Sequence, residues 1–166
     1  MMRIIDALIP KQANNEYHGG SVAFYGFCLI VVTFLFKSTV HFLTPDSGVN
    51  SIASIILFEG DPDPNNVVYM FSAIMGLTQM MWTIMFGVVL WRYRSLIPLM
   101  LGFTLLERLF GLVVGWMHPL TPEYFAHTPP GKAGEIPGLL VSLLLLSLAL
   151  YNTVQYQNGQ TKETSM

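Results

Sequence analysis

Charged side chains are scarce in this sequence, at 11% of 166 residues, whereas hydrophobic residues make up 52%. A typical soluble domain carries about 25% charged residues. Eighteen charges cannot cover the surface of so apolar a globule with polar groups. The composition therefore excludes an ordinary soluble domain and predicts an integral membrane protein.

Several kinds of chemistry have no support in the sequence. Cys28 is the single cysteine, which excludes an intrachain disulfide and CxxC redox chemistry. The net charge is −2 and no basic run exists, so nucleic acid is not expected as a partner. No GxSxG, P-loop or HExxH motif occurs, and no closed zinc-site spacing is present, so neither a metal nor a cofactor is predicted.

Four apolar stretches have the length of a membrane span, about 20 residues. They are residues 21–43, 67–91, 95–116 and 137–155. Each must be helical, because lipid offers no partner for an unpaired backbone group. We predict an all-α integral membrane protein: residues 1–166 form a single membrane domain, a four-transmembrane-helix bundle with a polar, loose tail at 157–166.

The loop between the first two predicted spans contains a short apolar patch at residues 51–59. We predict a short interfacial helix there, lying on the outer membrane surface. The alternative is a segment packed over the mouth of the bundle. The first nine residues are mostly apolar and are expected to form an interfacial helix on the cytoplasmic side.

The distribution of Lys and Arg predicts how the chain is oriented. One side of the predicted membrane holds five basic residues outside the spans and the other side holds one. The five are Arg3, Lys11, Arg92, Arg94 and Lys162, and the one is Lys132. The positive-inside rule then places the N- and C-termini in the cytoplasm of a multi-pass protein of the cell (inner) membrane.

A polar cluster is predicted inside the bilayer. Glu107 and Arg108 lie about 18–20 Å into the third span, where each ionisable group costs at least about 2.5–3.5 kcal/mol. Lys37 and His41 on the first span and Gln79 on the second lie at similar depth. These five residues form either interhelical ion pairs and hydrogen bonds or a site for a ligand, proton or substrate.

Two patterns of small residues predict close helix packing. Ser72, Gly76, Gln79, Thr83 and Gly87 recur with the period of one helical face on the second span, and Gly111 and Gly115 form a GxxxG pattern on the third. Small residues let neighbouring membrane helices approach closely. Both patterns are therefore expected at helix–helix contacts.

The layout of four short spans, with the segment Leu105-Leu106-Glu107-Arg108-Leu109-Phe110-Gly111 and a Leu-rich last span, resembles the small DoxX-like bacterial membrane proteins. The resemblance rests on this general layout and on Arg108 with Gly111, three residues further along the chain. Some proteins of this kind resemble accessory subunits of quinone-linked redox systems. The resemblance implies no catalytic residue.

Three functions remain open from the sequence. The leading hypothesis is a non-enzymatic accessory or assembly subunit, or a binder of a lipophilic molecule such as a lipid or quinone, in contact with membrane lipids and in a homo-oligomer or larger membrane complex. The first alternative is a membrane enzyme acting on a lipid or quinone-like substrate through Glu107 and Arg108. The second is an oligomeric proton-coupled transporter.

Overall fold

Four long helices make up most of the computed structural model, which describes residues 2–163. They are α2 (Ser21–Leu43), α3 (Asn65–Arg92), α4 (Ile97–Met117) and α6 (Glu135–Glu163). All four are long and apolar enough to cross a membrane, which confirms the predicted four-helix membrane bundle. The shorter elements are α1 (Met2–Leu8), α5 (Pro130–Ala133) and the 3-10 turns η1 (Arg94–Leu96) and η2 (Pro122–Tyr124).

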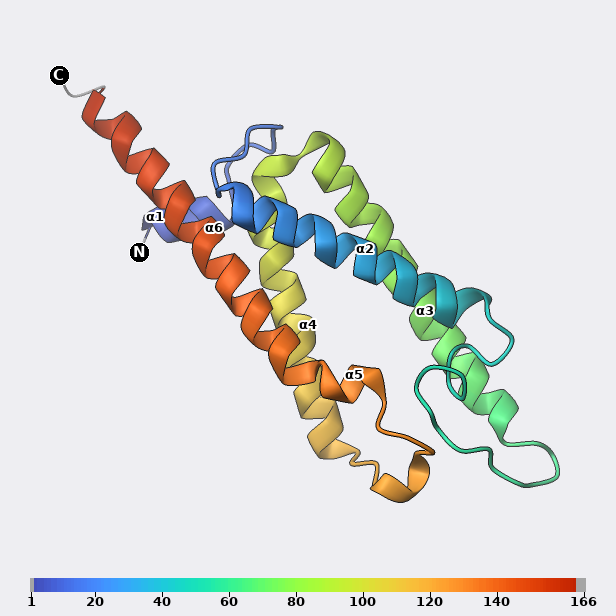
Figure 1. Ribbon diagram of the computed structural model, residues 1–166. Coiled ribbons are helices and arrows are strands. Elements are labelled where there is room, and N and C mark those ends of the chain that lie inside the picture. Colours follow the sequence, from blue (N-terminus) through green and yellow to red (C-terminus); the bar gives the residue numbers. More distant parts are fainter. Residues whose placement is uncertain (1, 164–166) are drawn as a thin grey trace.

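The helices are arranged as two pairs, α2 with α3 and α4 with α6 (Figure 1). Both termini lie at one end of the bundle, which we call the terminal end. The opposite end carries the loops 44–64 and 118–134, and we call it the loop end. The two pairs lie close together at the terminal end and diverge towards the loop end (Figure 1).

The buried apolar core occupies mainly the half of the bundle near the terminal end. It takes residues from the first part of α2, the last part of α3, the first part of α4 and the middle of α6. Phe86 of α3 is its centre, with ring centroids 5.3 Å from Phe27 and 5.4 Å from Phe34. No comparable core fills the space between the two pairs at the loop end, among the residues that the structure describes.

Most of the apolar surface of the helices is left uncovered by the chain itself. Between 17% and 28% of the apolar window of each candidate span is buried inside the protein. Exposed side chains of this kind are suited to hydrocarbon, in which they need no polar partner. Their exposure follows from a membrane environment and does not indicate a poorly packed fold.

Gly76 sets the close approach of α2 and α3. A Cβ atom on this residue would lie 2.6 Å from the carbonyl carbon of His41 and from the backbone nitrogen of Phe42. The predicted small-residue face of α3 is therefore confirmed at Gly76, with Gln79 and Thr83 also buried. It does not extend to Gly87, which has no neighbour within 4 Å, because Phe86 takes the buried position there.

The last helix is longer than predicted. The fourth span was expected to end at residue 155 and to be followed by a loose tail, but α6 continues to Glu163. No proline interrupts the sequence after Pro137, and the Thr161 hydroxyl donates to the Gln157 carbonyl within the extra turns. Residues 157–163 of the predicted tail are thus helical, and residues 164–166 lie outside the described part of the chain.

The predicted interfacial helix at residues 51–59 is wrong. The chain forms turns up to Ser51-Ile52-Ala53, and Ile55 then makes a bridge with Phe125 of the other long loop. The backbone nitrogens of Ile56 and Ala126 donate to Tyr124 and Ser54 and complete this loop–loop contact. Pairing with the second loop satisfies backbone groups that a surface helix would have satisfied internally.

Asp46 holds the first of these loops in place. Its carboxylate accepts hydrogen bonds from the backbone nitrogens of Gly48 (3.1 Å), Asn50 (3.1 Å) and Ser51 (2.8 Å). Burial raises the pKa of this carboxyl, but the hydrogen bonds from Ser51, Gly48 and Thr44 outweigh it and lower the pKa to about 2. The ionised form is therefore the one that the folded loop favours.

We expect the contribution of Asp46 to stability to disappear in acid. Because its folded pKa is below that of the unfolded chain, the contribution is complete above about pH 4 and is lost as the pH falls towards 2. Thermal unfolding of the wild type and of Asp46→Asn, followed from pH 6 to pH 2, measures this. The variant should be less stable at pH 6 and the difference should narrow in acid. A difference that is constant with pH would contradict the assignment.

Candidate functional site

A cavity of about 450 Å³ lies between α3 and α4, beside the core, with which it shares Phe34 and Phe86. Its walls are mainly aromatic and apolar. On one side are residues of α3, on the other residues of α4, and Phe34 of α2 also contributes. The lining comprises Phe34, Met75, Thr78, Gln79, Trp82, Phe86, Phe103, Thr104, Leu106, Glu107 and Phe110.

Aromatic contacts join the two walls of this cavity. The ring of Trp82 on α3 lies 5.7 Å from that of Phe103 on α4, and 5.9 Å from that of Phe86. Phe103 and Phe110 lie on the same face of α4, two turns apart, with 41% and 64% of their surface exposed. The volume and the apolar lining are those of sites for small lipophilic molecules, which occupy about 300–1,000 Å³.

Gln79 is the one predicted site residue that is buried, with 9% exposure. Its side-chain oxygen is inaccessible and has no hydrogen-bond partner among the residues described. The neighbouring hydroxyls cannot supply one, because Thr83 donates to the carbonyl of Gln79 and Thr104 donates to that of Met100. A buried acceptor of this kind costs about 1–3 kcal/mol unless another molecule donates to it.

Glu107 connects this cavity with a second one of about 360 Å³. Phe34 and Glu107 line both, and the second cavity is otherwise lined largely by charged residues of α2, α4, α5 and α6. These are Lys37, Arg108, Lys132 and Glu135, with Gly111 and Gly131 beside them. The two cavities together form a cleft with an apolar part and a charged part, and we refer to it below as the cleft.

Lys37 and Glu107, two members of the predicted polar cluster, do not form a close ion pair. Both residues line the cleft, and both Lys37 and Arg108 are near enough to Glu107 to interact with it electrostatically. Within residues 2–162, however, no nitrogen of either cation lies within 4.0 Å of the Glu107 carboxylate. The structure thus brings Lys37, Gln79, Glu107 and Arg108 to one cleft without joining them to each other.

His41 lies apart from the other four. Its Nδ1 is 2.8 Å from the carbonyl oxygen of Ser47, so Nδ1 carries the proton and donates. The Ser72 hydroxyl donates to the same carbonyl at 2.9 Å. His41 therefore anchors the first loop to α2 and α3, and it lines neither cavity of the cleft.

The GxxxG pattern on α4 does not mark a helix contact in this chain. A Cβ atom on Gly111 or Gly115 would meet no neighbour within 4 Å. Gly111 instead lines the charged part of the cleft. The absence of a side chain there widens the cleft.

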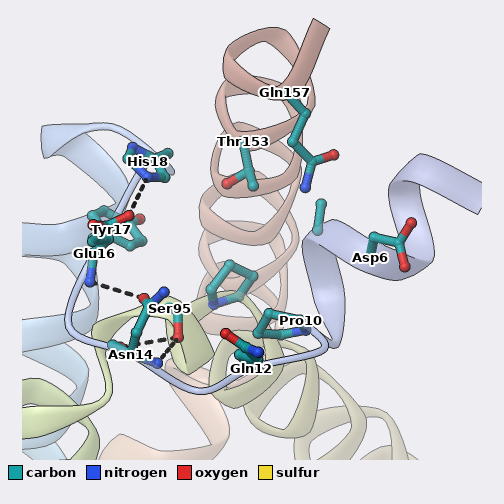
Figure 2. Close-up of a pocket in the computed structure, with 12 residues that line it drawn as sticks. Asp6, Pro10, Gln12, Asn14, Glu16, Tyr17, His18, Ser95, Thr153 and Gln157 are labelled. Carbon is teal, nitrogen blue, oxygen red and sulfur yellow. Dashed lines mark hydrogen bonds and ion pairs between the residues drawn. The ribbon is translucent and has the colours of Figure 1, made fainter. Parts of the chain in front are cut away.

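A separate small pocket lies at the terminal end, where residues 10–18 cross between α1, α4 and α6 (Figure 2). Its volume is about 120 Å³, and Asn14 and Ser95 are joined in it by three hydrogen bonds of 2.9–3.2 Å. His18 lies 3.7 Å from the Glu16 carboxylate and stacks on Tyr156 at 3.6 Å. The polar groups of this pocket fasten residues 10–18 to η1 and α6, which explains the pocket without a ligand.

Sequence reasoning missed the aromatic walls and the charged mouth of the cleft. Trp82, Phe103 and Phe110 were not singled out from the sequence, and Lys132 and Glu135 were assigned to the second long loop. A spacing signal was available, since Met75, Gln79, Trp82 and Phe86 share one face of α3. Helix α3 also carries five methionines, and Met75 is the one that lines the cleft.

Comparisons of this chain with protein-family models, with curated proteins and with solved structures find no match. The resemblance to DoxX-like proteins therefore stays an expectation. A function is therefore inferred from the geometry of the cleft.

Proposed function

We propose that this protein binds a lipophilic amphiphile of lipid or quinone size in the cleft between α3 and α4. It would act in the inner membrane with both termini in the cytoplasm, alone or as an accessory subunit of a larger complex. The observation that carries the proposal is a cavity of about 450 Å³ whose walls are mainly aromatic and apolar and also include the polar side chains of Gln79 and Glu107.

The lining of the cleft supports an amphiphile more than a simple hydrocarbon. A purely apolar ligand would leave the polar side chains of Gln79 and Glu107 in an apolar environment. A ligand with a polar head and an apolar body suits both kinds of lining, since the head can lie beside these polar side chains while the body packs on Trp82 and Phe103. Water alone would leave the aromatic walls wet.

Leu106 provides a direct test, because it lines the cleft and is 44% exposed. Leu106→Trp adds bulk to the cavity and is expected to lower the occupancy of co-purified amphiphile at least about tenfold. Leu109→Trp is the matched control, since Leu109 lies on the same helix, is 41% exposed and lines neither cavity.

Native mass spectrometry of the three proteins from a mild detergent gives the occupancy. We expect a bound molecule of lipid mass in the wild type and in Leu109→Trp, and little in Leu106→Trp. Equal occupancy in all three proteins, or none in the wild type, would rule out binding in this cleft.

A further inference from the structure

Three cations from three different helices converge on the charged part of the cleft. They are Lys37 of α2, Arg108 of α4 and Lys132 of α5. Glu107 and Glu135 line the same cavity, so the lining carries one more positive than negative charge. Elements distant in sequence contribute these groups, and the convergence is thus a property of the fold.

The three cations form no close ion pair with the carboxylates beside them. Within residues 2–162, no ion pair of 4.0 Å or less joins Lys37, Arg108 or Lys132 to Glu107 or Glu135. The two ammonium groups rest on aromatic rings instead, Lys37 at 5.8 Å from the centre of Phe34 and Lys132 at 5.6 Å from that of Phe125. Both therefore retain hydrogen-bond donors for another group.

Arg108 has both a fixed position and an unused donor. Its Nε is buried and has no hydrogen-bond partner among the described residues. Its guanidinium packs against Gly138 of α6, where a Cβ atom would lie 2.8 Å from Cζ. A planar guanidinium held in this way presents donors in a fixed fork, which matches the oxygens of a phosphate or carboxylate.

We infer that the head group of the bound amphiphile is anionic, a phosphodiester carrying one negative charge, held by Lys37, Arg108 and Lys132 while its hydrocarbon chain lies between Trp82 and Phe110. This inference rests on the proposed function, because it names the class of ligand for the same cleft. A single negative charge balances the one excess positive charge of the lining. Burying an unpaired charge within a span is costly, so the anion and the cations stabilise each other.

Two lipids with the same chains and different head groups test this inference. Dioleoyl phosphatidylglycerol carries a phosphodiester, and dioleoylglycerol carries none. Their affinities for the purified, delipidated protein can be measured by native mass spectrometry. We expect the wild type to bind the phosphatidylglycerol at least about tenfold more tightly. Glycerophosphoglycerol, which has the same phosphodiester without the chains, should compete at least a hundredfold less effectively.

Two variants remove the cations one at a time. Arg108→Gln and Lys37→Gln should each lower the affinity for phosphatidylglycerol about fivefold to tenfold and leave that for dioleoylglycerol within twofold. If Arg108→Gln does not fold, Lys37→Gln decides, because Lys37 is exposed and packs little. Lys11→Gln is the control, because Lys11 lines none of the cavities described above and should change neither affinity.

The outcomes separate the two proposals. Equal affinity for the two lipids, or loss of both in the cation variants, would overturn the anionic head group and leave a cleft that binds a neutral amphiphile. Binding of neither lipid would overturn the proposed function as well. Competition by glycerophosphoglycerol as strong as that by phosphatidylglycerol would show a site for a free anion and overturn the amphiphile.

Discussion

Replacing Gly76 with valine is expected to lower the free energy of unfolding by about 3 kcal/mol or more. The reason is that the new side chain would enter the backbone of α2, whose atoms at His41 and Phe42 lie 2.6 Å from the position of its Cβ. Backbone cannot move aside as a flexible side chain can. The two helices would have to separate, and with them the His41–Ser47–Ser72 contacts that hold the first loop.

Gly87→Val is the matched control for this effect. Gly87 lies on the same helix, three turns further along, and a Cβ there meets nothing within 4 Å. The same change of residue should therefore alter stability by less than about 0.5 kcal/mol, as surface substitutions do. Unfolding of the two variants in mixed micelles, followed by circular dichroism, measures both. Equal loss of stability in the two would contradict the assigned α2–α3 contact.

The second large effect concerns Gln79, whose replacement by leucine is expected to change stability and binding in opposite directions. Leucine removes a buried oxygen that has no partner, and so should stabilise the ligand-free protein by about 1–3 kcal/mol. The same change removes a polar side chain from the lining of the cleft, and should weaken binding of the amphiphile about tenfold. A residue that merely joins two helices would lose stability on this substitution.

Thermal unfolding of the delipidated protein, with and without added dioleoyl phosphatidylglycerol, separates the two roles. We expect a higher midpoint for Gln79→Leu without lipid and a smaller increase when lipid is added. Leu106→Ile serves as the control for a small change of shape in the same cleft. A lower midpoint without lipid, together with an unchanged response to lipid, would mean that Gln79 is a packing residue alone.

The number and type of the helices could be predicted because the bilayer imposes them. A length of about 20 apolar residues and the need to satisfy every backbone group leave little choice of structure. The same physics says nothing about where a span ends once it leaves the lipid, and α6 continues through a polar segment that was expected to be loose. The loop at residues 51–59 failed for a related reason: its pairing partner, Phe125, is 70 residues away in the sequence.

The cleft itself could be predicted only in part. The unusual depth of Lys37, Gln79, Glu107 and Arg108 marked them as candidates, and all four line it. What the sequence does not contain is the divergence of the two helix pairs, which turns these residues from ion-pair partners into the walls of a cavity. His41 was expected at the same depth as these four residues, but it does not line the cleft. Its Nδ1 donates to the carbonyl of Ser47 instead.

A structure of the wild-type protein determined in a lipid mesophase, without added ligand, tests occupancy of the cleft most directly. We expect elongated density along Trp82 and Phe103, with a compact polar end within hydrogen-bond distance of Arg108. A closed cleft, in which Gln79 bonds directly to Glu107 and α3 packs against α4 along its length, would contradict it.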